Sequence, residues 1–596
     1  MVLGMRCRRP STEAGLGGAG SFSQYLARSG VRAGRRAGAV LVAVIVAAAG
    51  ALASPATATA TATASDGDGP VVTVRQGRLQ GVEKRGVDRF LGIPYAAPPK
   101  DQLRWRPPQP VRHWPGTRPA KAMGPRCPQS VEFGKDLPES EDCLFLNVYT
   151  PARPSHSPRP VLVWIHGGSL VSGSGNDYDG SALAARGSVV VTINYRLGAL
   201  GFLALGGLSE ESPDAVSGQY GLMDQQAALR WVRENAGAFG GDRDNVTVFG
   251  ESAGGGSICD HLASPPAAGL FQRAIAQSVC VTDTPEQTTA KLQGADFASQ
   301  AGCGSANEAA CLRDLPVHAI MRNQGRFGWS PAYGGPLLPE PVRAAVRAGR
   351  VHHVPVIAGT THDEGTFFVY LLYPEGLPLP SDFYRKAIAH HFRAGDRDQV
   401  VQDIMDRYPL DMYEGDPRKA LSAALGDGAF SCAVNLSNKQ LASRQPVHAY
   451  EFNDHHPVDS SDSDFRWWPN GPLGAYHGSE LPYVFQRKLG QGDTGKPAFN
   501  RAQQVLSDTM AGYWSRFAAT GTPNGDRAPH WPRFTTAAPS VQSLSPGVGG
   551  VRPESDFSAE HQCGFWEPLW LRKDAITVNL GPLPELPPVP PDQFIP

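Results

Sequence analysis

The chain has 596 residues, of which 41% are hydrophobic and 19% are charged, and its formal net charge is −1. This composition is typical of a globular protein that is long enough to bury a large core. The near-zero net charge excludes a strong electrostatic field, so we expect neither nucleic acid nor an anionic membrane surface as a partner.

The first segment of the chain has the pattern of an export signal. Residues 1–36 carry seven Arg and a single acid, Glu13, and an apolar run follows from Ala37 to Ala53, ending in Ala-Leu-Ala. This run is near the lower length limit for a membrane span, but its Ala- and Gly-rich composition favours a cleaved signal. We therefore expect residues 1–53 to be a signal peptide, with export as a secreted protein and no stable membrane anchor. The sequence leaves the Sec and twin-arginine routes open.

Residues 54–69, which are dominated by Ala, Thr and Ser, are predicted to form a disordered spacer. Beyond them, apolar β-branched runs alternate with stretches typical of helices. The predicted strands are 160–165, 189–195, 246–249, 273–279, 354–358 and 447–452, and residues 224–235 are predicted to form a helix. Near-continuous apolar runs indicate strands buried on both faces of a parallel sheet, so the pattern predicts an α/β fold.

A Gly-rich segment, His166-Gly167-Gly168-Ser169, directly follows the first of these strands. Glycines allow a backbone to approach a reacting oxygen closely, and backbone N–H groups held there stabilise a negative oxygen in a transition state. The alternative is a simple surface turn.

The second motif is Gly250-Glu251-Ser252-Ala253-Gly254, a G-x-S-x-G element between a predicted strand and a small-residue helix start. The five letters alone are weak, because chance gives roughly half an occurrence in a chain of this length and composition. The strand–turn–helix context is what indicates a nucleophile elbow, in which the turn lifts the Ser hydroxyl out of the sheet. The alternative is a Gly-rich structural turn.

With these motifs the chain resembles the type-B carboxylesterase/lipase family, which also contains the cholinesterases. The resemblance covers roughly residues 70–570. Further family-like blocks are 92–95, 141–148, 194–196, 221–225 and 239–241. The resemblance implies an α/β-hydrolase fold, with a central, mostly parallel β-sheet flanked by helices. We expect this domain to span residues 70–575, followed by a Pro-rich C-terminal tail over residues 576–596.

The same resemblance implies a catalytic triad in the order Ser, Glu, His. Its acid lies in a D-E-G element, which Asp363-Glu364-Gly365 matches, and its base lies in an H-G-x-E element that begins at His477. We therefore expect Ser252 as nucleophile, Glu364 as acid and His477 as base, with Asp363 as the alternative acid.

The oxyanion donors implied by the family are the backbone N–H groups of Gly168, Ser169 and Ala253. Ser169 departs from the pattern, because most members have a third Gly there. The amide donor remains, but a side chain now lies near the acyl site, so we expect bulky alcohol groups to be excluded.

Nine cysteines are present, and Cys7 lies in the predicted signal peptide. Eight remain, and an even number in an exported chain suggests disulfides, with buried free thiols as the alternative. The resemblance implies the pairs Cys127–Cys143 and Cys303–Cys311. For the other four we favour Cys259–Cys280 and Cys432–Cys563. No Cys-x-x-Cys or Cys/His cluster supports a zinc site, so we expect no metal and no cofactor.

The sequence thus predicts a secreted serine carboxylesterase that hydrolyses small to medium neutral carboxylic esters through an acyl-enzyme. A lipase that acts on longer acyl chains is the alternative. A catalytically inactive, cholinesterase-like binding protein is the third possibility, although such proteins usually lack the serine. The partner we expect is a small-molecule ester, and the sequence does not indicate an oligomeric state.

Overall fold

The computed structural model describes residues 69–129, 138–280, 284–304, 307–325, 328–393, 395–458, 471–490, 495–526, 528–572, 576–581 and 583. The predicted signal peptide, the spacer up to residue 68 and most of the Pro-rich tail lie outside the described residues.

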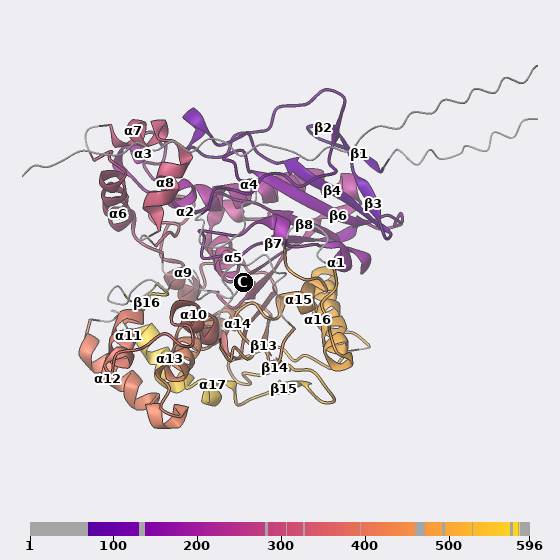
Figure 1. Ribbon diagram of the computed structural model, residues 1–596. Helices are drawn as coiled ribbons and strands as arrows, with labels where there is room; N and C mark the ends of the chain where they lie inside the picture. Colours follow the sequence, from indigo (N-terminus) through magenta and orange to yellow (C-terminus); the bar gives the residue numbers. More distant parts are fainter. Residues whose placement is uncertain are drawn as a thin grey trace, which may run out of the picture. The chain divides into compact units, whose positions relative to one another are not determined.

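An 11-stranded sheet forms the centre of the described part of the chain, in the order β15-β14-β13-β11-β10-β9-β7-β8-β6-β4-β3 (Figure 1). Its strands are β3 (Val82–Lys84), β4 (Val87–Pro94), β6 (Phe145–Pro151), β7 (Arg159–Ile165), β8 (Val189–Ile193), β9 (Gly241–Glu251), β10 (Arg273–Gln277), β11 (Val356–Thr361), β13 (Val447–Phe452), β14 (Val541–Leu544) and β15 (Val551–Glu554). The strands from β8 to β14 run parallel, and the pairs β8–β6, β6–β4, β4–β3 and β14–β15 are antiparallel. The predicted mostly parallel sheet is therefore confirmed.

Two smaller sheets accompany it. The first joins β1 (Val71–Val74), β2 (Gly77–Gln80) and β5 (Thr117–Pro119), and the second pairs β12 (Phe392–Arg393) with β16 (Thr577–Val578).

Alternation along the central strands explains why both faces of the sheet are covered. In β7, Val161, Val163 and Ile165 belong to one core cluster, whereas Leu162 and Trp164 belong to a second. Successive side chains of a strand point to opposite faces, so an uninterrupted apolar run supplies both cores at once.

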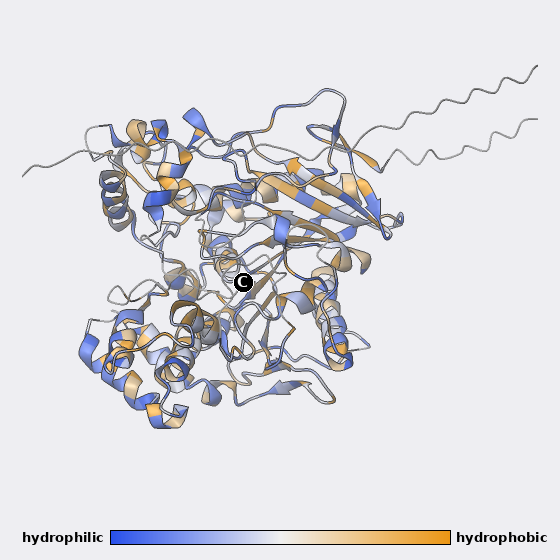
Figure 2. Ribbon diagram, viewed as in Figure 1, coloured by the Kyte–Doolittle hydropathy of each residue, from blue (hydrophilic) through white to orange (hydrophobic). Residues whose placement is uncertain are grey.

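The helices of the described chain are α1 (Ser181–Ala185), α2 (Gly198–Phe202), α3 (Gly206–Glu210), α4 (Tyr220–Asn235), α5 (Ala253–Ala263), α6 (Gln287–Gln300), α7 (Glu308–Asp314), α8 (Val317–Gln324), α9 (Val342–Ala348), α10 (Glu364–Leu372), α11 (Phe383–His391), α12 (Arg397–Arg407), α13 (Pro417–Leu425), α14 (Cys432–Ala442), α15 (Leu481–Phe485), α16 (Arg501–Thr520), α17 (Phe557–Glu560) and α18 (Cys563–Leu571). A π-helical turn, η7 (Gly426–Ser431), joins α13 to α14. Figure 2 shows that the helices around the sheet carry both hydrophobic and hydrophilic residues, as expected for elements with one face on a core. Among the described residues, no helix combines the length and apolarity needed to cross a membrane.

Helix α4 begins at Tyr220, one turn before the predicted start at Asp224. The sequence pattern predicts Asp224 as an N-terminal signal, but Asp224 is fully buried and pairs with Arg196 at 2.7 Å. Asp224 therefore lies inside the helix, where it forms a buried ion pair. The helix starts earlier because Tyr220 and Leu222 pack into the core.

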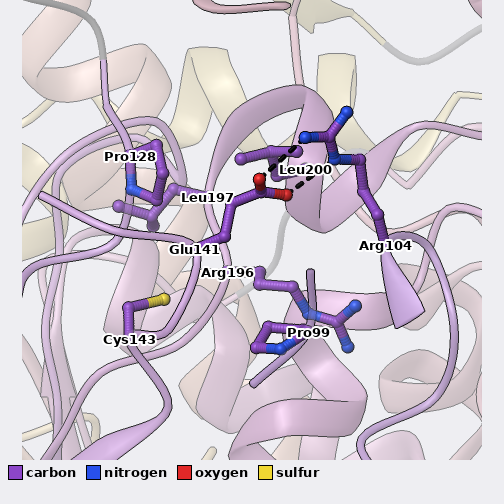
Figure 3. A pocket seen from close by; sticks show the side chains of 8 residues that line it. All are labelled: Pro99, Arg104, Pro128, Glu141, Cys143, Arg196, Leu197 and Leu200. Atoms are coloured by element: carbon purple, nitrogen blue, oxygen red, sulfur yellow. Dashed lines mark hydrogen bonds and ion pairs between the residues drawn. The ribbon is translucent and has the colours of Figure 1, made fainter. Parts of the chain in front are cut away.

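Buried polar contacts fix the connections on the N-terminal side of the sheet. The guanidinium of Arg104 donates two hydrogen bonds, of 2.6 and 2.7 Å, to the carboxylate of Glu141 (Figure 3). Its other terminal nitrogen donates to carbonyls near the end of α7, including that of Leu315 at 2.7 Å. Both side chains line a small pocket that includes none of the candidate catalytic residues. Their role is therefore structural.

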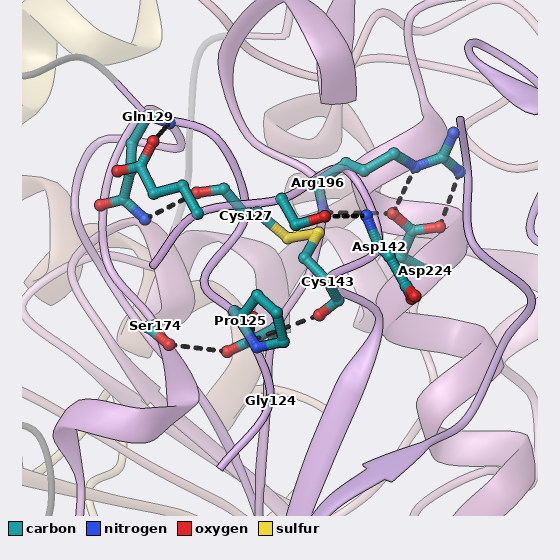
Figure 4. Close-up of a disulfide and its surroundings, with 12 residues drawn as sticks. Gly124, Pro125, Cys127, Gln129, Asp142, Cys143, Ser174, Arg196 and Asp224 are labelled. Atoms are coloured by element: carbon teal, nitrogen blue, oxygen red, sulfur yellow. Dashed lines mark hydrogen bonds and ion pairs between the residues drawn. A yellow bond between two sulfur atoms is a disulfide. The ribbon is translucent and has the colours of Figure 1, made fainter. Parts of the chain in front are cut away.

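Four disulfides join the eight cysteines: Cys127–Cys143, Cys259–Cys280, Cys303–Cys311 and Cys432–Cys563. Figure 4 shows the first of these beside the Arg196–Asp224 ion pair. Each pairing is the one expected from the sequence, so none of the eight cysteines is left as a free thiol.

Candidate active site

Ser252 lies on a strained turn between β9 and α5. Its φ of 56° and ψ of −126° are unusual for a residue with a side chain, and its backbone N–H donates to Gln277 O at 3.0 Å. The turn is tight: a Cβ on Gly254 would lie 2.1 Å from the carbonyl oxygen of Ile165. Only glycine fits there, which explains why the G-x-S-x-G spacing accompanies this turn.

The Gly-rich loop after β7 packs directly against this turn. A Cβ on Gly167 would lie 2.9 Å from the Ser252 Cβ. Tyr195 holds the loop in place. Its hydroxyl donates to His166 O at 2.8 Å, and its ring stacks on the His166 ring. Burial lowers the pKa of His166 to about 3, so this ring is neutral and acts in packing.

The three expected oxyanion donors lie in these two segments. Within the described part of the chain, the N–H groups of Gly168, Ser169 and Ala253 donate no hydrogen bond to another residue. They are therefore free to bind a substrate oxygen. Ser169 adopts a φ of 54° and its side chain is exposed.

His477 and Glu364 are in direct contact. The Nδ1 atom of His477 lies 2.5 Å from Glu364 Oε2, and the other oxygen of Glu364 accepts from the backbone N–H of Thr361 at 2.9 Å. Glu364 is completely buried at the start of α10. Both its oxygens are fixed, so the imidazole is held in one orientation with Nδ1 protonated.

The alternative acid, Asp363, faces elsewhere. Its carboxylate contacts His362, His455 and the backbone N–H of Ala475, at 2.9, 3.1 and 2.8 Å. Glu364, rather than Asp363, is the carboxylate beside His477.

The Nε2 atom of His477 lies 3.1 Å from Glu251 Oε1, and Glu251 directly precedes Ser252. Among the described residues, no hydrogen bond joins His477 to Ser252. His477, the expected base, thus contacts Glu251, which directly precedes Ser252, the expected nucleophile. Hydrogen bonds of this kind are often long without substrate and shorten in the reacting complex.

Three buried carboxylates surround His477: Glu251, Glu364 and Glu480. Burial would lower the pKa of His477, but the charge of Glu251 and then that of Glu364 raise it to about 9. Burial raises the pKa of Glu251 to about 7 against the opposing charge of His477. Burial and the charge of Glu251 also raise the pKa of Glu480, to about 8. The protonation of His477 is therefore linked to that of Glu251 and Glu480.

Sequence reasoning missed several residues of this site. Glu480 accepts from Gln277 at 2.8 Å, and the rings of Phe368 and Phe430 lie 4.9 and 5.1 Å from that of His477. Glu251 and Glu480 were inside the recognised motifs and could have been considered as carboxylates near the base. Nothing in the pattern around Phe430 indicated that it would reach the site.

Comparisons with known proteins identify the family of the chain. The model of the carboxylesterase family matches residues 68–566. Para-nitrobenzyl esterase of Bacillus subtilis (strain 168) is 37% identical over 485 residues, which cover 78% of this chain and 92% of that protein. Cocaine esterase of Homo sapiens is 34% identical over 540 residues, 84% of this chain and 92% of that protein.

A solved structure of PNB esterase superimposes with a TM-score of 0.69 at 33% identity, covering 83% of this chain and 98% of that one. Together with the sheet order and the elbow at Ser252, these matches show that the chain belongs to the carboxylesterase family and is a carboxylic ester hydrolase.

Proposed function

We propose that Ser252, Glu364 and His477 form the catalytic triad of an esterase that acts on small to medium neutral carboxylic esters. The observation that carries this proposal is the position of His477. Its Nδ1 atom contacts Glu364, and its Nε2 atom contacts Glu251, the residue before Ser252 in the elbow.

In this mechanism Ser252 Oγ attacks the ester carbonyl carbon while His477 Nε2 takes the hydroxyl proton. The carbonyl oxygen becomes negative and accepts hydrogen bonds from the N–H groups of Gly168, Ser169 and Ala253. His477 then gives its proton to the departing alcohol, which leaves an acyl-Ser252 ester. Water repeats the attack with His477 as base, so the carboxylic acid departs and the serine hydroxyl is restored.

Neutral substrates fit the charges around the site. The carboxyl groups of Glu251, Glu364 and Glu480 are all buried near His477, and each of them that is ionised would repel an ester with its own negative charge. Phe368 and Phe430 provide apolar surface beside the base.

A series of p-nitrophenyl esters from acetate to palmitate tests the acyl preference and separates an esterase from a lipase. We expect kcat/KM to be highest for short and medium chains and to fall for the longest. A kcat/KM that rises continuously to palmitate would favour the lipase.

We also propose that residues 70–575 form the catalytic domain and that the mature protein is secreted after removal of residues 1–53. Four disulfides are compatible with an oxidising, extracellular compartment. N-terminal sequencing of protein recovered from the medium should begin just after Ala53. Full-length protein retained inside the cell would contradict export.

A further inference from the structure

A second cluster of histidines and carboxylates lies next to the site in sequence but takes no part in the hydrolysis. His362 follows the end of β11, and Glu451 lies in the neighbouring strand β13. His561 directly follows α17. The parallel pairing of β11 with β13 sets Thr360 opposite Glu451, so the strand ends bring His362 and Glu451 together.

The three side chains converge closely enough to share one ion. The ligand atoms of His362, Glu451 and His561 all lie within 4.8 Å of one another. Nε2 of His561 is 2.5 Å from Glu451 Oε1, and the His362 and His561 ring centroids are 5.3 Å apart. Tetrahedral zinc with bonds of 2.0–2.2 Å separates its ligand atoms by about 3.4 Å, so small side-chain movements suffice.

Each imidazole is also oriented as a metal ligand would be. Nδ1 of His362 lies 2.9 Å from Asp363 Oδ1, and Nδ1 of His561 lies 2.6 Å from Asp427 Oδ1. Metal-binding histidines characteristically use the other ring nitrogen for such a carboxylate contact, which fixes the ring and its tautomer. Nε2 of His561 is thereby turned toward Glu451, and Nε2 of His362 is turned toward Glu560.

Burial and charge favour a cation at this point. Glu451 is 1% exposed and His561 is 2% exposed, whereas the side chain of His362 is 25% exposed and gives a route to solvent. Glu560, whose Oε1 lies 3.1 Å from His362 Nε2, supplies a further oxygen on the solvent side.

We propose that His362, Glu451 and His561 bind a divalent transition-metal ion of the zinc type, with Glu560 or a water molecule as fourth ligand. Two nitrogen and two oxygen donors suit zinc in tetrahedral geometry. The ion links the ends of β11 and β13 to α17 and steadies the segment that leads into Glu364. Its role is structural, since the ester chemistry uses none of these ligands.

Zinc alone is the probe for this site, added to purified mature enzyme that carries no polyhistidine tag and has been treated with EDTA and dialysed. We expect about one zinc per chain after equilibrium dialysis, and a Tm that rises with free zinc concentration. Cobalt in place of zinc should give the visible absorption of a tetrahedral complex. The absence of stoichiometric zinc would overturn the proposal.

Substitutions then locate the ion. His362 is partly exposed, so the variant His362→Gln should fold. It should lose zinc binding and the zinc-dependent rise in Tm. Asp427→Asn keeps all the ligands and should weaken zinc binding by about 10- to 100-fold, because it removes the carboxylate that orients His561.

His455→Gln is the matched control. The ring centroids of His455 and His362 are 5.0 Å apart, and His455 contacts Asp363, but His455 is not a proposed ligand. It should bind zinc like the parent enzyme. Retained binding in His362→Gln, or loss of binding in His455→Gln, would contradict the assignment.

Discussion

At the scale of single residues, the unusual feature of the site is one histidine among three buried carboxylates. An isolated histidine has a pKa of about 6.5, whereas the charge of Glu251 and then that of Glu364 raise the pKa of His477 to about 9 despite its burial. Glu251 is therefore placed to tune the base as well as to precede the nucleophile.

The pH dependence of activity tests this arrangement. Activity requires neutral His477, so kcat/KM should rise with pH through the pKa of His477, which is raised above its ordinary value of about 6.5. Glu251→Gln removes the charge that does most to raise this pKa and should shift the acid limb to lower pH by about one unit. Glu480→Gln is the control and should shift the acid limb less, because the buried Glu480 has a weaker effect on the pKa of His477. An unchanged acid limb in Glu251→Gln would show that Glu251 does not act on the base.

The triad assignment predicts losses that do not add. Ser252→Ala and His477→Ala should each lower kcat by more than about a thousandfold, and the double variant should be little worse than either. Glu364→Gln should lower kcat by about 10³- to 10⁴-fold, because it disturbs the tautomer of His477. Asp363→Asn should cost far less, since Asp363 contacts His362 and His455 rather than the base. An equal loss in Asp363→Asn would mean that the acid is misassigned.

Ser169 is a testable departure from the family. It holds a φ of 54° and adds an exposed side chain at the oxyanion loop. Ser169→Gly keeps the amide donor, relieves the backbone strain and opens space, so it should raise kcat/KM for tert-butyl acetate relative to ethyl acetate. An unchanged ratio would show that Ser169 does not limit the size of the alcohol group.

Among these residues, the sequence predicted those that lie in recognisable motifs. Ser252 was marked by its strand–turn–helix context, but one histidine of sixteen could be chosen only through the family pattern. Glu451, Asp427 and His561 come from separate segments without local spacing, so no motif could predict their convergence with His362.

At the scale of elements, six of the seven parallel strands were predicted, whereas β14 and the antiparallel strands were missed. The six predicted strands correspond to β7, β8, β9, β10, β11 and β13, all within continuous apolar runs. Five strands of the central sheet were missed. β3 and β15 have largely exposed patterns, β14 has only four residues, and the apolar runs of β4 and β6 are interrupted by polar residues such as Arg89 and Asn147. The edge strands β3 and β15 are short and antiparallel, and they lack the long apolar run that marks a strand buried on both faces.

The disulfides allow a comparison between elements. Cys432–Cys563 joins α14 to α18 across a sequence separation of 131, whereas Cys303–Cys311 spans only 8. If disulfides act mainly by limiting the unfolded chain, replacing the first pair by Ser should lower the free energy of unfolding by about 5 kcal/mol, and replacing the second by about 2–3 kcal/mol. Urea unfolding of the two double variants, without reductant, measures this difference. A larger loss for the short loop would contradict the loop-entropy account.

At the scale of the whole molecule, the sheet explains how segments far apart in sequence form one site. Ser252 follows β9, and Glu364 follows β11, two parallel strands of the same sheet with β10 between them. The resemblance predicted this fold, and the order of the strands was needed to see that the same edge also gathers His362 and Glu451.

The central claim is that Ser252 is a nucleophile activated by His477. Titration with an organophosphate tests it most directly, because only an activated serine is phosphorylated stoichiometrically. We predict loss of activity at about one equivalent, with the phosphoryl adduct located on Ser252 by mass spectrometry and no labelling of Ser252→Ala. An active enzyme that remains unlabelled, or that is labelled on another residue, would contradict the account.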